Sequence, residues 1–417
     1  MFRSSSKFQG RAKSKVRKRW RIFHATDFES LMKPSFTFCF MLGFFPYKIH
    51  ASTFEFSRSR YIVSSIFICI FCVYALVMFY ELDIAGNIKF GSMPDTLQSN
   101  CYYLLGFFIT IVTYILTRPR MRLLQTISDI SSRLPPDTFQ KLSRLIHAKD
   151  IIGFFFLLGM LPKCYSAHFL DIMIKIITLY VTLLVFQMDM LYMNCVCVIK
   201  ACFQRINDNL TNLRELLKND EPHLLRRIYH EQKNPFLLME LKALKKQHLM
   251  VSDTLQLLNT IFSLQLLATI VLTFAEITFS LYFYIIQWRG NGVSIINLEK
   301  QIWYQYFITS IAYYSTKITL IVWACETGKD QALEIGTTVH DVLISTSDKQ
   351  IKDELQLFSL QILHRDNIFS AKGLTVDATL LTAIVGSITT YLLILIQFMV
   401  SGDDCNGKQA SNNTLKN

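Results

Sequence analysis

Seven stretches of this sequence are long and apolar enough to cross a lipid bilayer as helices. The hydrocarbon core of a bilayer is about 30 Å thick, so a helix that crosses it needs about 20 mostly apolar residues. The seven stretches are residues 61–80, 100–117, 151–170, 176–199, 254–286, 302–325 and 374–400. Hydrophobic residues make up 51% of the chain and charged residues 18%, which is typical of membrane proteins. The sequence therefore predicts an all-α membrane protein with seven transmembrane helices.

The segments that connect these stretches differ in their content of Lys and Arg. The richer set consists of residues 1–60, 118–148, 200–253 and 326–373. This set carries 34 Lys and Arg, whereas the alternate set carries seven. Because cytoplasmic loops are enriched in these residues, we expect a cytoplasmic amino terminus and an extracellular carboxyl terminus. This asymmetry across the membrane accounts for the net charge of +12, so no nucleic-acid partner is predicted, and the basic amino-terminal segment is expected to be attracted to anionic lipid as well.

The alternation of apolar and polar stretches predicts seven consecutive regions. They are a basic cytoplasmic region at 1–60, transmembrane helices 1–4 at 61–199, a cytoplasmic helical extension at 200–253, transmembrane helices 5 and 6 at 254–325, a cytoplasmic helical segment at 326–373, the last transmembrane helix at 374–400 and an extracellular tail at 401–417. We expect the long cytoplasmic helices to pack together as an anchor domain, either with an ordinary core face or with a subunit contact.

Apolar residues recur at steps of three and four along the cytoplasmic extension, which indicates one buried helical face. They are Phe203, Ile206, Leu210, Leu213 and Leu217, followed by Leu237, Leu241, Leu244, His248, Val251, Leu255 and Leu258. The second group continues directly into the fifth transmembrane stretch.

Motifs of catalysis and of metal binding are missing from the sequence. There is no GxSxG, HExxH, P-loop or GxGxxG motif. Cys69 and Cys72 have CxxC spacing but lie in apolar sequence, and no second pair of ligands completes a zinc site. We therefore expect no enzyme activity, no cofactor and no metal site, and a packing role for most of the ten cysteines.

Three charged residues fall inside apolar stretches, namely Asp189, Glu276 and Lys317. A charge at the centre of a membrane helix costs at least about 2.5–3.5 kcal/mol, so each should face the protein interior or water. A structural salt bridge and contact with a ligand or ion both remain open for each of them. Glu276 and Lys317 are one candidate pair, because their helices are consecutive.

Aromatic residues gather in the predicted outer halves of the transmembrane stretches. They include Tyr102, Tyr103, Tyr282, Trp303, Tyr304 and Tyr306. Such residues form a belt at the membrane interface in many proteins. A cavity lined by rings and a few polar groups would also hold a small ligand. These residues, with Asp189 and Glu276, are therefore the candidates for a ligand pocket.

The last apolar stretch carries a regular polar pattern. Thr390 and Gln397 are seven residues apart, as are Tyr391 and Phe398, so each pair lies on nearly one helical stripe. Close packing of helices through small residues and the lining of an axial pore would both produce this pattern. Gly373 is expected to break the chain before this helix.

The sequence AKGLTVDATLLTAIVGSITTYLLILIQF closely resembles the carboxyl-terminal signature of the insect gustatory receptors. In that signature, Thr-Tyr is followed by five apolar residues and then by Gln-Phe, which are Thr390, Tyr391, Gln397 and Phe398 in this chain. Gly373-Leu374 and Asp377 also fit the family pattern. The rest of the chain is too divergent for a residue-level match.

The resemblance implies a tastant-gated, non-selective cation channel in the plasma membrane of sensory neurons. The channel would be a homotetramer that conducts monovalent and divalent cations, and the need for a co-receptor is left open. The last helix of each subunit would line a central pore, with Gln397 and Phe398 as the gate and Ile394, Thr390 and Tyr391 nearby. The tastant itself (a sugar, a bitter compound, an amino acid or a nucleoside) is not determined, nor is a response to heat or light excluded.

Two other classes of membrane protein would show a different sequence pattern. A seven-span receptor that signals through a G protein would have its amino terminus outside, opposite to the charge pattern, and would carry a DRY-like triplet after the third span. A secondary transporter would show two repeated halves with broken helices, and no such repeat is found.

Two N-glycosylation sequons give a prediction of topology. Asn412 belongs to a sequon in the predicted extracellular tail and is expected to be an acceptor, whereas Asn209 is predicted to be cytoplasmic and bare.

Overall fold

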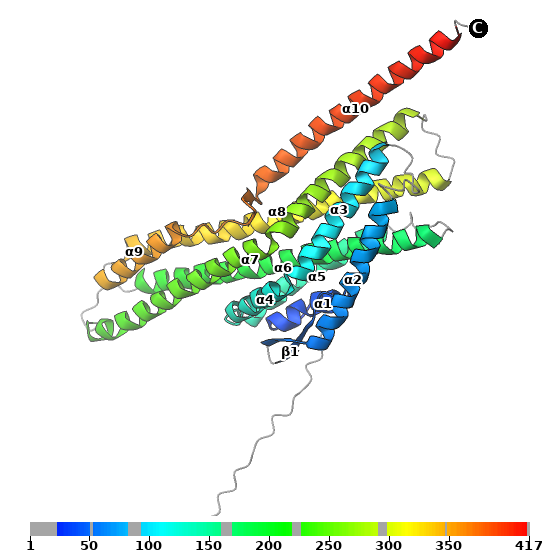
Figure 1. Cartoon of the computed structure of the whole chain (residues 1–417). Helices are drawn as coiled ribbons and strands as arrows, with labels where there is room; N and C mark the ends of the chain where they lie inside the picture. Colours follow the sequence, from blue (N-terminus) through cyan, green and yellow to red (C-terminus); the bar gives the residue numbers. More distant parts are fainter. Residues whose placement is uncertain are drawn as a thin grey trace, which may run out of the picture.

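The computed structural model describes residues 23–50, 53–81, 93–159, 169–218, 227–290, 298–346 and 348–414. Nearly all of these residues are helical (Figure 1). The helices are α1 (Phe28–Met41), α2 (Arg58–Phe79), α3 (Met93–Ile115), α4 (Thr117–Ser131), α5 (Pro136–Gly159), α6 (Phe169–Lys218), α7 (Arg227–Gly290), α8 (Leu298–Ser345), α9 (Lys349–Leu363) and α10 (Ala378–Thr414). Two antiparallel hairpins pair β1 (Tyr47–His50) with β2 (Thr53–Phe56), and β3 (Ser370–Ala371) with β4 (Leu374–Thr375). The predicted all-α class is confirmed.

By length and hydropathy, four helices of the described residues can cross a membrane. The four segments are Arg58–Val77, Lys175–Leu217, Pro235–Ile286 and Ala378–Gln397. The pair α3 and α4, bent by 66° at its break, would be a fifth. The predicted stretch 151–170 falls short because residues 160–168 lie outside the described part of the chain. The stretch 302–325 contains Lys317 and many Tyr, Ser and Thr residues, which lower its hydropathy.

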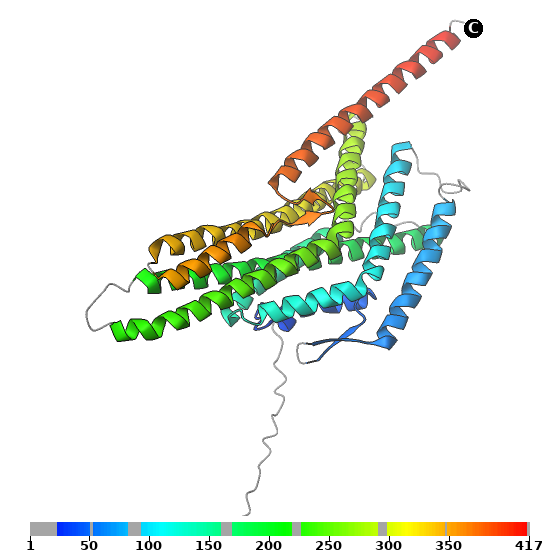
Figure 2. The same ribbon diagram turned by 60° about the vertical axis from the view of Figure 1, so that its left-hand side comes forward.

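Three helices are much longer than a bilayer is thick. α6, α7 and α8 contain 50, 64 and 48 residues. At 1.5 Å per residue, α7 is roughly 96 Å long, whereas crossing the hydrocarbon core takes about 30 Å. The three helices therefore extend well beyond a membrane, and in Figures 1 and 2 they run side by side together with α9.

The helical stripe predicted in residues 200–253 is buried between these projecting helices. Its apolar members are at most 3% exposed, apart from the half-buried Leu217, and His248 is fully buried. His248 lies between the rings of Phe203 and Phe358, at 6.0 and 5.4 Å between ring centroids. The periodicity thus identified the face on which α6, α7 and α9 pack.

α6 forms the centre of the bundle. Every residue from 184 to 199 is buried, because α1, α3, α4, α5, α7 and α8 all pack around this helix. A helix that is apolar on most of its surface lies either in a protein core or in a membrane, and here the neighbouring helices enclose it. Cys195 and Cys197, at 0% and 5% exposed, lie in this run as free thiols, in agreement with their predicted packing role.

The start of α10 is fixed by local sequence. Lys372 and Gly373 have φ of 52° and 88° and form the two-residue turn of the β3–β4 hairpin, a conformation that glycine adopts without strain. Asp377 then caps α10: its carboxylate accepts hydrogen bonds from the backbone N–H of Thr379 at 3.1 Å and of Leu380 at 3.3 Å. The predicted break at Gly373 is confirmed.

Candidate functional site

A buried ion pair lies where α6, α7 and α8 meet. Lys317 Nζ of α8 is 3.2 Å from Asp189 Oδ2 of α6, and both side chains are 1% exposed. Thr269 of α7 donates a hydrogen bond of 3.0 Å to Asp189 Oδ1. The ammonium also lies 5.2 Å from the ring centroid of Tyr314 and 5.6 Å from that of Tyr313. Lys317 is thus paired with Asp189, and its predicted pairing with Glu276 is wrong.

Glu276 takes a different partner on a neighbouring helix. Its carboxylate accepts a hydrogen bond of 3.0 Å from Gln98 Nε2 of α3, and the residue is 5% exposed. A buried carboxylate costs free energy unless it is hydrogen-bonded, and Gln98 supplies one such bond. Glu276 therefore links α7 to α3, two turns of α7 beyond Thr269.

The two candidate tyrosines of α3 point at α6. The hydroxyl of Tyr102 donates to the carbonyl of Thr178 at 3.1 Å and lies 2.5 Å from Thr182 Oγ1. The hydroxyl of Tyr103 lies 3.0 Å from Thr178 Oγ1. Both rings thus present their polar ends to the protein interior, whereas residues of an interfacial belt would present them to the headgroups.

The other pocket candidates lie near the same ends of α7 and α8. Tyr282 of α7 is 6% exposed, and Tyr306 of α8 is half-buried. The rings of Tyr284 and Phe307 stack at 5.1 Å between centroids and so hold these two helix ends together. The side chains of Trp303 and Tyr304 lie outside the described residues. Polar and aromatic groups of α3, α6, α7 and α8 therefore gather in one region of the bundle.

α10 stands apart from this bundle, as Figures 1 and 2 show. It rests on α7 and α8 along one face, which buries Leu380, Ile384 and Ile388. The ring of Tyr391 packs edge-on against Phe274 of α7, with the centroids 5.7 Å apart. In the most apolar part of Ala378–Gln397, only 11% of the residues are buried. In the most apolar parts of α6 and α7, 61% of the residues are buried.

The uncovered face of α10 carries the predicted pore residues. Thr390 and Gln397 are exposed, and Ile394 is 39% exposed. Tyr391 is 54% exposed despite its contact with α7. The side chain of Phe398 lies outside the described residues.

α2 is another apolar helix that the rest of the described chain covers poorly, since only 17% of the residues in its most apolar part are buried. Its exposed apolar residues include Ile62, Val63, Ile66, Phe67, Cys69, Ile70, Val73, Leu76 and Val77. The exposed residues of α10 instead include Thr382, Ala383, Gly386, Ser387, Thr389, Thr390 and Gln397. The exposed face of α2 suits lipid, whereas the exposed residues of α10 combine these small and polar side chains with the apolar Val385, Tyr391, Leu393 and Ile394.

Several residues of the site were not among the candidates predicted from the sequence. Thr178, Thr182, Thr269 and Gln98 supply the hydrogen-bond partners of the candidate residues. The sequence could have indicated them, because each is a polar residue in or beside a predicted transmembrane stretch. Arg120, counted above as a cytoplasmic cation, is 4% exposed and donates to the carbonyl of Thr113 at 3.1 Å.

The fold and the site define a multi-pass helical membrane protein with an internal polar cluster and one helix left largely uncovered. The chain belongs to the 7tm chemosensory receptor family, whose model matches residues 32–401. This membership confirms the resemblance noted in the last helix and identifies the protein as a receptor rather than an enzyme.

Two Drosophila melanogaster proteins are similar to the chain over part of its length. Putative gustatory receptor 28a is 31% identical over 175 residues, which cover 41% of this chain and 39% of that protein. Putative gustatory receptor 28b is 30% identical over 152 residues, or 36% of this chain and 32% of that protein. The chain thus matches well under half the length of either relative.

Solved structures of the insect olfactory receptor OR5 from Machilis hrabei have the same fold. One has a TM-score of 0.66 and 11% identity, covering 88% of this chain and 97% of OR5. The complex of OR5 with eugenol has a TM-score of 0.66 and 13% identity, covering 89% and 98%. At this level of identity the likeness concerns the fold alone.

Proposed function

We propose that this protein is a gustatory receptor of sensory-neuron plasma membranes that acts as a tastant-gated, non-selective cation channel. Four identical subunits would place their α10 helices around a central pore. The observation that carries the proposal is the uncovered side of α10, where small and polar side chains lie on a helix apolar enough to cross a membrane. They are Thr382, Ala383, Gly386, Ser387, Thr390 and Gln397.

The polar side chains on this side of α10 find no partners in lipid, whereas water in a pore would hydrogen-bond them. The hydroxyl of Thr390 can bond its own helix, and it donates to the carbonyl of Gly386 at 3.0 Å. The amide of Gln397 has more hydrogen-bonding groups than one helix can satisfy, and lipid supplies no partners. Water in a pore or a neighbouring α10 would supply them, and both are provided when four copies surround an axis.

The gate would lie near Gln397 and Phe398. Hydrophobic constrictions close a pore by excluding water, and a polar side chain that enters the lining restores a wet path. Phe398 would form the closed ring, and Gln397 would replace it on opening. Tyr391, nearly two turns earlier, contacts Phe274 and would couple this part of α10 to α7.

α7 offers a direct route from the polar cluster to the pore helix. Glu276 faces Gln98 of α3, whereas Phe274, two residues earlier, contacts Tyr391 of α10. A tastant that replaces the hydrogen bonds among α3, α6 and α7 would shift α7, and α10 with it. The tastant favours the open state only to the extent that it binds the open state more tightly than the closed state.

The proposal includes the predicted orientation, with the long helical extensions in the cytoplasm. The exposed ends of α7 and α9 carry Lys242, Lys246 and Lys349, and cytoplasmic segments are enriched in such residues. In this orientation the polar cluster would lie in the outer half of the bundle, on the side from which a tastant outside the cell would approach.

Expression of the chain alone in cultured cells tests the proposal. The cells would be challenged with sugars, bitter compounds, amino acids and nucleosides while calcium entry and whole-cell current are recorded. We expect at least one compound to open a conductance for both Na⁺ and K⁺ that persists when G-protein signalling is blocked. A response that disappears with that block would instead identify a G-protein-coupled receptor.

A further inference from the structure

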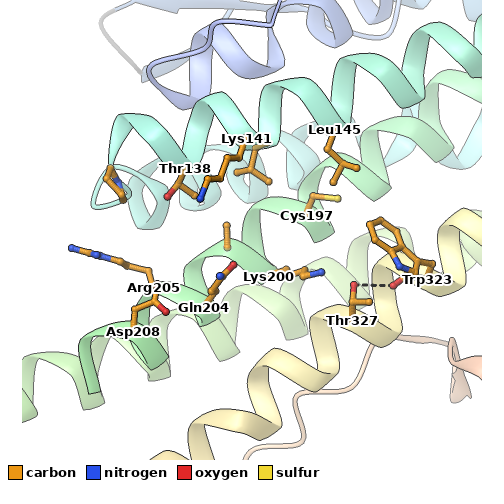
Figure 3. A pocket seen from close by; sticks show the side chains of 13 residues that line it. Thr138, Lys141, Leu145, Cys197, Lys200, Gln204, Arg205, Asp208, Trp323 and Thr327 are labelled. Atoms are coloured by element: carbon orange, nitrogen blue, oxygen red, sulfur yellow. Dashed lines mark hydrogen bonds between the residues drawn. The ribbon is translucent and has the colours of Figure 1, made fainter. Parts of the chain in front are cut away.

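A cavity of about 290 Å³ lies between α5, α6 and α8, where the apolar part of α6 ends (Figure 3). It is distinct from the polar cluster, because it begins two turns of α6 beyond Asp189. Its floor is apolar and consists of Leu142, Cys197 and Ala201, all at most 9% exposed.

Three cationic side chains line this cavity. Lys141 comes from α5, and Lys200 and Arg205 come from α6, as Figure 3 shows. Within the described part of the chain, none of the three makes an ion pair. Asp208 is the one carboxylate of the lining, and Gln204 adds a neutral amide. The cavity therefore carries an excess of positive charge and suits an anion.

Lys200 is held in place before any ligand arrives. Its ammonium lies 5.2 Å from the centre of the Trp323 ring, a cation–π contact that restricts a long and flexible side chain. A cation whose position is already fixed loses less conformational entropy when it binds an anion.

The rim of the cavity continues onto an apolar, exposed stripe of α5. Leu145 of the lining is 41% exposed, and Ile152 and Phe155, seven and ten residues further on, are 55% and 66% exposed. These spacings place the three side chains on one face of the helix. Trp323 on the opposite wall is 42% exposed, and Trp is enriched at membrane interfaces.

We propose that this cavity binds the phosphorylated headgroup of an anionic lipid, with a phosphoinositide as the occupant. The cations would bind the phosphates, and the acyl chains would run along Leu145, Ile152 and Phe155. The volume is at the lower end of the range for small-ligand sites, about 300–1,000 Å³, which suits a headgroup whose tails remain in the bilayer. The inference rests on the proposed orientation, because phosphoinositides belong to the cytoplasmic leaflet.

The full chain, purified in detergent, would be titrated with three probes: dioctanoyl phosphatidylinositol bisphosphate, dioctanoyl phosphatidylcholine and inositol trisphosphate. Binding would be followed by thermophoresis of the labelled protein. We expect the phosphoinositide to bind in preference to phosphatidylcholine. Each cation near an anionic lipid contributes roughly fivefold, so the variant K141Q/K200Q should raise the Kd roughly 30-fold.

The variant K242Q/K246Q is a matched control, since it removes two exposed lysines of α7 outside the cavity. It should leave the Kd unchanged, and K200R should retain most of the affinity. Equal binding by K141Q/K200Q and the unmodified chain would overturn the proposal. Inositol trisphosphate that binds as tightly as the lipid would overturn the lipid assignment in favour of a soluble anion. Because both membrane faces are accessible in detergent and no current is measured, failure of the channel proposal would leave this result unaffected.

Discussion

At the scale of single residues, the buried ion pair between Asp189 and Lys317 constrains how α6 and α8 pack. Both side chains are 1% exposed, and their charges lie 3.2 Å apart. Removal of one partner leaves the other charge buried and uncompensated, which costs about 3–5 kcal/mol. We therefore expect Lys317→Met to lower the thermal stability of the purified protein strongly and to reduce its amount at the cell surface.

The double variant Asp189→Asn with Lys317→Met removes both charges and should recover most of that loss. Lys349→Met, which changes an exposed lysine of α9, is the control and should leave the stability unchanged. A single Lys317→Met variant as stable as this control would contradict the structural role given to the pair.

Also at the residue scale, His248 makes the stability of the projecting helices depend on pH. It lies in the predicted cytoplasmic extension at 200–253, before the predicted fifth transmembrane stretch at 254–286, and Gln361 Nε2 of α9 is 3.1 Å from its Nδ1, a contact that needs an unprotonated ring nitrogen. Burial, together with the charge of Arg365, lowers the pKa of His248 from 6.5 to about 4. The folded state thus binds fewer protons than the unfolded state between these two values.

Stability from this residue is therefore complete above about pH 6.5 and is lost as the pH falls toward 4, by up to about 3 kcal/mol. Denaturant unfolding between pH 7.5 and 4.5 would measure it. We expect His248→Gln to flatten the dependence on pH. The same slope in both proteins would show that other groups cause it.

At the scale of elements, α10 is the helix on which the proposed gate depends. Gln397→Ala and Phe398→Ala should each change tastant-evoked or resting current while surface expression stays normal, since both positions lie on a helix that is barely buried within its own subunit. The matched control Ile70→Ala lies on the apolar exposed face of α2 and should leave currents unchanged. Currents like those of the unmodified channel in both α10 variants would count against the gate.

The sequence predicted elements better than it predicted partners. The buried stripe from Leu237 to Leu258 could be predicted because its helical period repeats over many turns. The break at Gly373 could be predicted because glycine adopts a positive φ more easily than other residues. The ion-pair partner of Lys317 could not be predicted from the sequence. Glu276 was the candidate because its helix precedes that of Lys317 in the chain, whereas the packing of α8 against α6 brings Asp189 next to Lys317. The burial of Arg120 could not be predicted for the same reason, because it depends on the bend between α3 and α4.

At the scale of the whole molecule, the orientation in the membrane is the property with the simplest test. α10 continues through the predicted extracellular tail and carries Asn412 in its last turn, whereas Asn209 lies in α6 among the projecting helices. Treatment with an endoglycosidase should shift the gel mobility of the protein, and Asn412→Gln should abolish that shift. Asn209→Gln should have no effect, and a glycan at Asn209 would reverse the orientation.

The most direct test of the central claim is the accessibility of α10 from the ion pathway. Single cysteines would be introduced at Ser387, Thr390 and Gln397 on its uncovered face, with Ile388 of its buried face and Val73 of α2 as comparison positions. A positively charged, membrane-impermeant thiol reagent would be applied to open channels during current recording. We expect it to block current in the first three variants and to leave the two comparison variants and the unmodified chain unchanged. Block at Val73 or Ile388 but at none of the other three positions would contradict a pore lined by α10.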